Sequence, residues 1–168
     1  MKTAGLGLLA ALLLPGAARA DLQLKGVEWQ LAAARGRPKP SALAAWDQKA
    51  GAKDPGKLRF AVRVENSGRD RAEGVVIRFA LSARIAPISG GESVWAVPFE
   101  LGERRVPVLK PGEAKELPMP AVHLVSYLRR LQAQGFWPEE LKVQVMIDPK
   151  TGDNVATNVR ESVLPVAR

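Results

Sequence analysis

Apolar and polar residues alternate along three stretches of the chain. In residues 57–65 every even position is apolar and most residues between them are charged, and residues 74–82 are apolar at each odd position. Residues 141–148 repeat the alternation. A period of two places one face of a strand in a core and the other in solvent. We predict three strands here. The first two either pair as antiparallel neighbours or, because the polar turn at 66–71 is long enough, cross between two sheets.

Further strands are predicted from weaker patterns. Residues 22–31 alternate with a slip in phase near Gly26, which is typical of a β-bulge. Residues 94–99 and 104–109 each contain a proline, which cannot donate to a ladder, so both are predicted at sheet edges. Lys110-Pro111-Gly112-Glu113 has the composition of a type II turn. Short final strands are expected at 114–117 and 155–166.

The period changes between Pro120 and Gln134. Leu124, Tyr127, Leu128 and Leu131 follow the spacing of one helix face, and Gly135 suits the position after the end. We predict an amphipathic helix over about 120–134. A second, short helix is predicted from a Ser41 cap to residue 50, and a turn at 136–140.

These elements predict a mostly-β fold. About seven short strands separated by turns indicate an immunoglobulin-like two-sheet antiparallel sandwich, with the helix at about 120–134 in a crossover connection. A parallel α/β fold is disfavoured because the strands alternate instead of being apolar throughout. Residues 21–168 are expected to form this single domain, and the pattern is clearest over 57–166.

Residues 1–20 have the three parts of a secretory signal peptide. Lys2 gives a positive start, residues 4–14 are uncharged and mostly apolar, and Ala18-Arg19-Ala20 is a cleavage site of the A-x-A type. The alternative is a membrane anchor, but a spanning helix needs about 20 apolar residues and Pro15-Gly16 ends this run. We expect export, to a periplasmic or extracellular location, and no transmembrane segment in the mature chain.

Composition restricts the chemistry. The chain has no cysteine, which excludes a thiol nucleophile, disulfides and a cysteine zinc site. Its 25 Lys and Arg exceed its 17 Asp and Glu, for a net charge of +8. This excess either attracts an anionic partner or keeps a mixed surface soluble, and the scattered cations favour the second interpretation. Nucleic acid is not expected in an exported compartment.

Three motifs resemble a known family. Residues 59–68 with 75–79, the Leu109-Lys110-Pro111-Gly112-Glu113 turn, and residues 145–149 with Asn154, Val155 and Asn158 are similar to motifs of bacterial immunoglobulin-like domains of the CARDB, or cell-adhesion-related, type. The resemblance covers about 57–166. The chain departs from it in the helix at 120–134 and in Ala156-Thr157-Asn158-Val159. It implies an extracytoplasmic sandwich used for adhesion or assembly and no catalytic residues.

No catalytic, cofactor or metal site is expected. The single histidine, His123, has no triad or metal partners in a recognisable motif. Carboxylate pairs remain as a remote hydrolase alternative, namely Glu139 with Glu140 and Glu113 with Glu116. Asp148, Asp153 and Asn154 either offer oxygens to Ca²⁺ or cap a turn, and turn capping explains them as well.

Tryptophan and arginine near loops and edges suggest a partner surface. Both residue types are enriched at interaction hot spots. The candidates are Trp95, Arg104, Arg105, Arg129, Arg130 and Trp137. The alternative for Phe136 and Trp137 is that they close the end of the sandwich under the helix.

The sequence therefore favours a non-catalytic exported module that binds another protein or an anionic component of the cell envelope. The alternative is a periplasmic accessory or chaperone-like subunit of an envelope complex. Pairing through an edge strand near 94–109 is the expected mode of binding.

Overall fold

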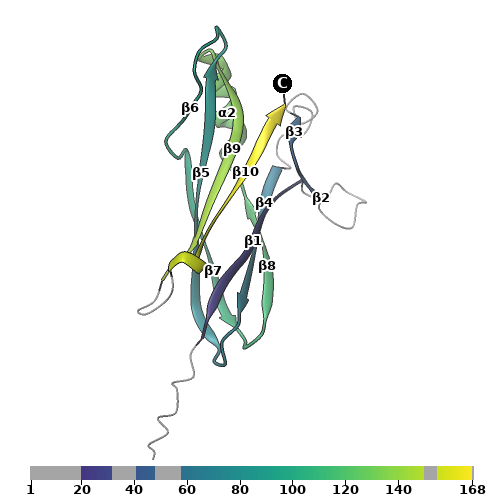
Figure 1. The fold of residues 1–168 in the computed structure, drawn as a ribbon, viewed down its shortest axis with the longest axis vertical. Helices are drawn as coiled ribbons and strands as arrows, with labels where there is room; N and C mark the ends of the chain where they lie inside the picture. The colour runs from purple at the N-terminus through teal and green to yellow at the C-terminus, as the bar shows by residue number, and fades with distance from the viewer. Residues whose placement is uncertain (1–19, 32–40, 48–57, 150–154, 168) are drawn as a thin grey trace, which may run out of the picture.

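Two β-sheets lie face to face, with one helix beside one end of the elongated molecule (Figure 1). The computed structural model describes residues 20–31, 41–47, 58–149 and 155–167. The first sheet has the order β2 (Ser41–Ala42), β1 (Leu22–Leu31), β4 (Leu58–Asn66) and β8 (Ala114–Pro120). The second has the order β3 (Trp46–Asp47), β10 (Val159–Ala167), β9 (Phe136–Ile147), β5 (Ala72–Pro87) and β6 (Val94–Trp95), and β7 (Glu100–Leu109) also pairs with β5.

This arrangement confirms the predicted sandwich. The neighbours β1–β4–β8 in one sheet and β10–β9–β5–β7 in the other follow the strand order of immunoglobulin-like sandwiches. All pairs are antiparallel except β3 with β10, which are parallel. The short helices are α2 (Leu124–Ala133) and a 3₁₀ turn at Val155–Thr157. Among the described residues, no helix is both long enough and apolar enough to span a bilayer.

The first two alternating strands lie in different sheets. β4 pairs with β1 and β8, whereas β5 pairs with β9, β6 and β7. The simple hairpin of residues 57–65 with 74–82 is therefore wrong, and the crossover is correct. Both strands bury one face, and they would do so whether they were paired in one sheet or packed against each other across the core. The alternating pattern therefore could not distinguish these two arrangements.

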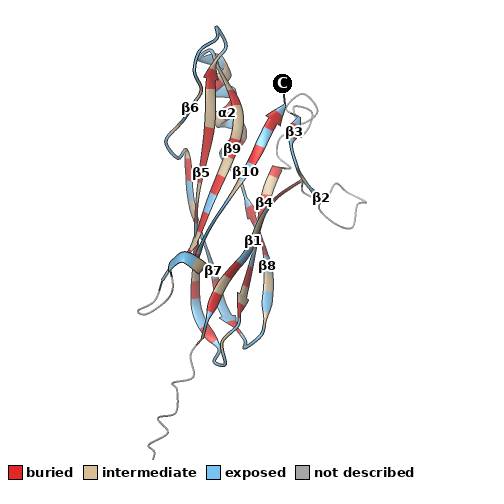
Figure 2. Ribbon diagram, in the orientation of Figure 1, coloured by how far each residue is buried: buried red, intermediate tan, exposed pale blue. Residues whose placement is uncertain are grey.

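The core lies between the alternating faces of the two sheets (Figure 2). Phe60 of β4 is fully buried at its centre, with edge-to-face contacts to Trp29 at 5.8 Å and Phe79 at 5.0 Å between ring centroids. Trp29 Nε1 donates to the Ser162 carbonyl at 3.3 Å, which links β1 to β10. The rings of Trp29, Phe60 and Phe79 thus connect the two sheets across the core.

A buried asparagine forms hydrogen bonds that connect the loops at the end of the sandwich opposite α2. Asn66 Oδ1 accepts from the backbone N–H groups of Asp21 and Gly68, at 3.2 and 3.1 Å. Its Nδ2 donates to the carbonyls of Asp70 and Leu109, at 2.7 and 3.1 Å. One side chain thus fixes the start of β1, the β4–β5 loop and the end of β7.

Helix α2 connects β8 of the first sheet to β9 of the second, as expected for a crossover. Leu124, Leu128 and Leu131 are its buried residues, in agreement with the predicted face. It is shorter than predicted, because Pro120 still pairs with Arg59 in β8 and His123 occupies the N-cap position. Gly135 follows the helix with a φ of +79°, the conformation that suits glycine.

The predicted helix from Ser41 is wrong over the residues that the structure describes. Ser41–Ala42 pairs with β1 and Trp46–Asp47 pairs with β10, and residues 48–57 lie outside the described part. Trp46 is buried, so its contacts in the core outweigh a local helix preference that was weak.

The predicted turn at 136–140 is also wrong, because these residues begin β9. Phe136 pairs with Pro87, and the chain turns just before it, where the Gly135 N–H donates to the Gln132 carbonyl at 3.0 Å. The register shifts where Arg84 faces Glu140 and Ile85 faces Pro138, so Glu139 is the additional residue of a bulge.

Other local predictions are confirmed. The register shifts between Leu24 and Gly26, the Glu113 N–H donates to the Lys110 carbonyl at 3.0 Å in the turn, and Gly112 has a φ of +69°. The last strand, predicted over 155–166, begins later than predicted, at Val159, because Val155–Thr157 form a 3₁₀ turn. The signal peptide through residue 19, together with Asp153 and Asn154, lies outside the described residues.

Candidate functional site: an open edge of the second sheet

Residues 94–109 run along one free side of the second sheet. β6 and β7 both pair with β5, opposite β9, and each has β5 as its ladder partner. Between them, the Ala96 and Phe99 N–H groups donate to the carbonyls of Ala83 and Leu81, each at 2.9 Å. We call Val94–Leu109 the open edge. Its position confirms what Pro98 and Pro107 predicted.

Large aliphatic side chains are exposed on and beside this edge. Val97, Leu101 and Val122 are 82%, 75% and 67% exposed, the three highest values for large hydrophobic residues in the described part of the chain. Leu101 and Val122 line the same groove. Large apolar side chains exposed near one another in this way are found at interaction sites of many proteins, although single exposed ones are common on any surface.

The groove lies between β7 and β8 and has a volume of about 440 Å³. Its residues come from β5, β7, β8 and the segment before α2: Phe79, Glu100, Leu101, Gly102, Glu103, Arg104, Met119, Pro120, Val122 and His123. Gly102 is required here, because a Cβ atom at this position would lie 2.4 Å from Cζ of Phe79. The Phe79 ring therefore packs directly against the backbone of the open edge.

Glu100 fastens the open edge to the start of α2. Glu100 is 7% exposed, and its two carboxylate oxygens accept from the backbone N–H groups of Val122 at 3.0 Å and His123 at 2.9 Å. These donors have no partner within the helix, so an acidic side chain suits this position. These two hydrogen bonds satisfy the buried carboxylate and hold the beginning of β7 beside the segment before α2.

A ring stack forms a second link between this edge and the helix. Phe99 and Tyr127 stack with centroids 4.0 Å apart and planes 11° apart. Burial raises the pKa of the Tyr127 hydroxyl. With Glu100, this stack holds the beginning of β7 in a fixed position beside α2.

The two arginines of β7 extend to opposite faces of the strand. The Arg104 guanidinium donates to the Pro118 carbonyl of β8, across the groove. Arg105 faces outward, opposite Val76, and its guanidinium lies 3.2 Å from Oε1 of Glu103. Glu103 and Arg105 thus form an exposed pair of opposite charges on the outer face of the open edge.

The six candidate surface residues do not form one patch. Arg104 faces Ile77 of β5, whereas Trp95 faces Arg84, seven residues further and therefore roughly 23 Å away. Trp95 is half-exposed and lies under the Lys142 ammonium, 4.2 Å from the ring centroid. Trp137 faces Ala86, on the other side of β5, and is partly buried. Arg129 and Arg130 are exposed on α2.

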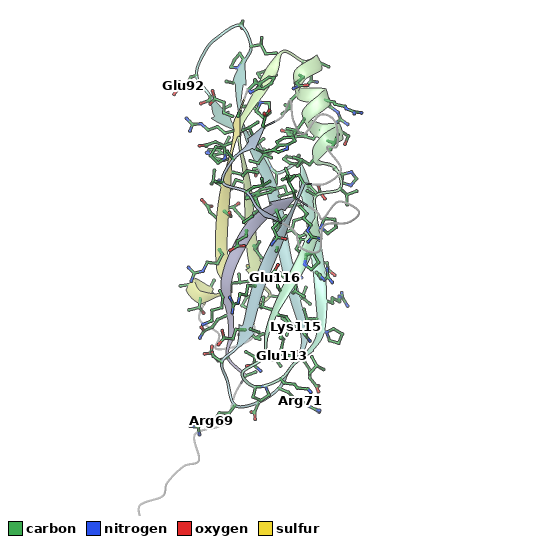
Figure 3. The ribbon with its side chains drawn as sticks, turned by 90° about the vertical axis from the view of Figure 1, so that its right-hand side faces the viewer. Arg69, Arg71, Glu92, Glu113, Lys115 and Glu116 are labelled. Atoms are coloured by element: carbon green, nitrogen blue, oxygen red, sulfur yellow. The ribbon has the colours of Figure 1, made fainter. Side chains whose placement is uncertain are left out.

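The carboxylates of the hydrolase alternative have other partners and do not line the groove. Glu113 accepts from the Lys110 N–H at 2.7 Å and lies 3.1 Å from Lys115 Nζ, and both lower its pKa, the backbone bond most. Lys115 and Glu116 lie at the start of β8 and Glu113 lies in the turn just before it, toward the end of the molecule where Arg69 and Arg71 lie (Figure 3). Glu116 accepts from Gln30, and Glu140 lies 3.5 Å from Arg84. Within the described ranges, no three acidic or histidine residues are grouped to hold a metal ion.

Sequence reasoning missed two residues of this site. Glu100 was not distinguished from other surface glutamates, and Gly102 gave no turn signal. The one available signal was a glutamate between two apolar residues, Phe99 and Leu101. The role of this glutamate could not be inferred from the sequence, because it depends on the start of α2, which lies close to Glu100 only in the folded protein.

Comparisons with known proteins found matches among solved structures. No protein-family model and no curated protein matches the chain, so the resemblance to the CARDB type stays a prediction. Similar solved structures include a β-D-glucoside glucohydrolase from Trichoderma reesei, 18% identical with a TM-score of 0.45, where the match covers 88% of this chain and 19% of that one. A β-glucosidase from Streptomyces venezuelae is 14% identical with a TM-score of 0.41, with 88% and 15% covered. A protein from Archaeoglobus fulgidus is 13% identical with a TM-score of 0.32, with 86% and 98% covered. The chain thus spans a small part of the two glycosidases, and at these scores the likeness carries no argument about activity.

Proposed function

We propose that this protein is a non-catalytic binding or assembly module that adds a strand of a partner chain to its open edge. The observation that carries the proposal is the coincidence of a free edge strand, β7, with the exposed side chains of Val97, Leu101 and Val122. An extended segment beside β7 gains backbone hydrogen bonds from the edge and apolar contacts from these side chains.

The groove supports this mode of binding. It follows β7 on the side facing β8, so alternate side chains of an added strand face Leu101 on the outside and the groove on the inside. Glu100 and the Phe99–Tyr127 stack hold the edge in place before binding. A fixed edge loses little conformational entropy when a partner docks.

Export is part of the proposal. The predicted signal peptide supports a location in the periplasm or outside the cell, where the module either acts alone or belongs to an envelope complex as an accessory subunit. The protein isolated from the envelope or medium is expected to begin at Asp21, which N-terminal sequencing measures. An intact Met1 terminus on that protein would contradict cleavage.

A crosslinking experiment tests the binding edge. A photo-reactive amino acid at position 101 is expected to capture a partner in cells of the native organism, and Leu101→Asp is expected to reduce co-purification of that partner at least tenfold. Val163→Asp is the control, since Val163 is an exposed valine of β10, separated from β7 by β9 and β5. Equal loss with both variants, or capture from position 163 but not 101, would overturn the proposed site.

A further inference from the structure

The outer face of β7 is complementary to itself. Along β7, Leu101, Glu103 and Arg105 face outward, because they lie opposite Ala80, Arg78 and Val76 on the outer side of β5, and the alternation of the strand places Pro107 on the same face. The charges on this face are one anion and one cation, two residues apart. We propose that the partner strand of the open edge is β7 of a second copy, paired antiparallel about a twofold axis at Arg104; this rests on the proposed function.

Symmetry and overlap restrict the register. A twofold axis perpendicular to the sheet leaves the outer face of each copy on the same side of the combined sheet, so outward residues of one β7 must face outward residues of the other. In two identical antiparallel strands this occurs only when the axis lies beside a residue that faces its own copy, and not between two residues. Only Arg104 and Arg105 are central enough for the ten residues of β7 to overlap almost completely. An axis at Arg105 would place Arg105 opposite Arg105 and Glu103 opposite Pro107, so that no opposite charges would meet, whereas an axis at Arg104 places Arg104 opposite its own copy but pairs Glu103 with Arg105.

The axis at Arg104 brings opposite charges together. Glu103 then faces Arg105 of the second copy, and the same contact occurs a second time across the axis. Leu101 faces Pro107, which covers part of the most exposed apolar side chain of β7. Directly opposed residues in antiparallel strands have Cβ atoms about 4.5–5.5 Å apart, close enough for ion pairs and apolar contact.

The inner face accepts this arrangement. Each Arg104 guanidinium is held by the Pro118 carbonyl of its own copy, so the two guanidinium groups are drawn toward separate β8 strands. Gly102 faces Val106 and adds no side-chain volume at that position. Pro107 cannot donate to the second strand, which leaves the backbone between Glu100 and Val106 to form the ladder.

Charge reversal tests the register directly. Two ten-residue strands bury less area than a standard interface, so the dimer is expected to be weak and its population to rise with concentration. In sedimentation experiments on the mature protein, Glu103→Arg alone and Arg105→Glu alone are expected to weaken dimerisation at least tenfold. An equimolar mixture of the two variants is expected to restore a dimer with one copy of each, because both contacts between positions 103 and 105 are then of opposite sign.

A cysteine probe gives a second readout in a chain without native cysteine. Arg104→Cys places two thiols opposite each other at a separation that a disulfide accepts, so a mild oxidant is expected to give a covalent dimer. Leu101→Cys is the matched control, since its two copies would lie six residues apart along the strands. Faster crosslinking at 101 than at 104, or a mixture that stays monomeric, would overturn the register.

The failures of the two proposals are distinguishable. A wild-type protein that stays monomeric at high concentration, while position 101 captures a different protein in cells, overturns the second-copy assignment and leaves the binding edge standing. A monomer that captures nothing at position 101 overturns both. In that case Pro107 and the charges of β7 act only to keep the edge from pairing.

Discussion

Asn66 shows how much one polar residue determines at one end of the sandwich. Its buried amide makes four hydrogen bonds to backbone groups of three separate segments. Ser67 and Gly68, which follow it, complete the polar turn that the sequence indicated. The turn was recognisable from composition, but the inward direction of Asn66 was not, since asparagine is equally common in exposed turns.

Replacing Asn66 with alanine is expected to lower the free energy of unfolding by about 2–4 kcal/mol, because buried N–H and carbonyl groups lose their partners. Urea denaturation measures the change. Ser67→Ala is the control, since the Ser67 hydroxyl makes its bonds at the surface, and it is expected to change stability little. Equal effects of the two variants would mean that the buried hydrogen bonds of Asn66 stabilise the fold no more than the surface hydrogen bonds of Ser67.

Gly102 is needed because of its neighbour and not because of its own backbone conformation. Gly102→Ala would place a methyl group 2.4 Å from the Phe79 ring, which also packs on Phe60. We expect a loss of about 1–3 kcal/mol from overpacking, measured by thermal or urea unfolding.

Two variants distinguish a steric effect from an effect of the glycine itself. Phe79→Leu in the same chain should make Gly102→Ala less costly, because the clashing ring atoms are removed. Gly26→Ala is the matched control, since no atom lies within 4 Å of the added Cβ. A full loss that persists in the Phe79→Leu background would contradict the steric explanation.

The lowered pKa of Glu113 links the β7–β8 turn to pH. A carboxyl whose folded-state pKa is lowered stabilises the fold fully above its ordinary value of 4.5, and this contribution disappears as the pH falls through the folded-state pKa. The Lys110 N–H is the main cause and Lys115 the second. We therefore expect Glu113→Gln to be less stable than the wild type at pH 7 and equal to it in strong acid. A stability gap that stays constant from pH 7 to acid would exclude this linkage.

At the scale of elements, strands with a strict period of two were predicted correctly, and short segments were not. β4, β5 and β9 carry their pattern over enough residues to define a buried face. The segments at 41–47 and 136–140 are too short for a period to appear, and their conformation is set by distant strands: Trp46 pairs beside Val166, and Phe136 pairs with Pro87. Local propensity could not supply these contacts.

The position of α2 depends on Glu100. We expect Glu100→Ala to lower the free energy of unfolding by about 1–3 kcal/mol, because two N–H groups before the helix lose a charged acceptor. Amide hydrogen exchange at Val122 and His123 should accelerate at the same time. Glu92→Ala is the control, since Glu92 lies exposed in the loop before β6. Unchanged exchange at both amides would show that the hydrogen bonds from these amides to Glu100 are not formed in solution.

At the scale of the whole molecule, the sandwich and its crossover helix could be predicted from the sequence, and the groove could not. Pro98 and Pro107 were sufficient to indicate an edge, because proline removes a donor wherever it stands. The assignment of β4 and β5 to separate sheets and the approach of β7 to α2 are long-range facts. These long-range contacts depend on which buried strand faces pack against each other. The alternation of apolar and polar residues alone is compatible with many different strand pairings.

The central place of β9 in the second sheet has a consequence for how the chain folds. β9 pairs with both β5 and β10, and its residues follow those of β5 by about sixty positions, as Phe79 faces Val145. The second sheet is therefore incomplete until almost the entire polypeptide is available, and loop closure over such separations is slow. Refolding is expected on the millisecond-to-second timescale, and a nascent chain that stops before β9 would expose the unpaired side of β5 to aggregation.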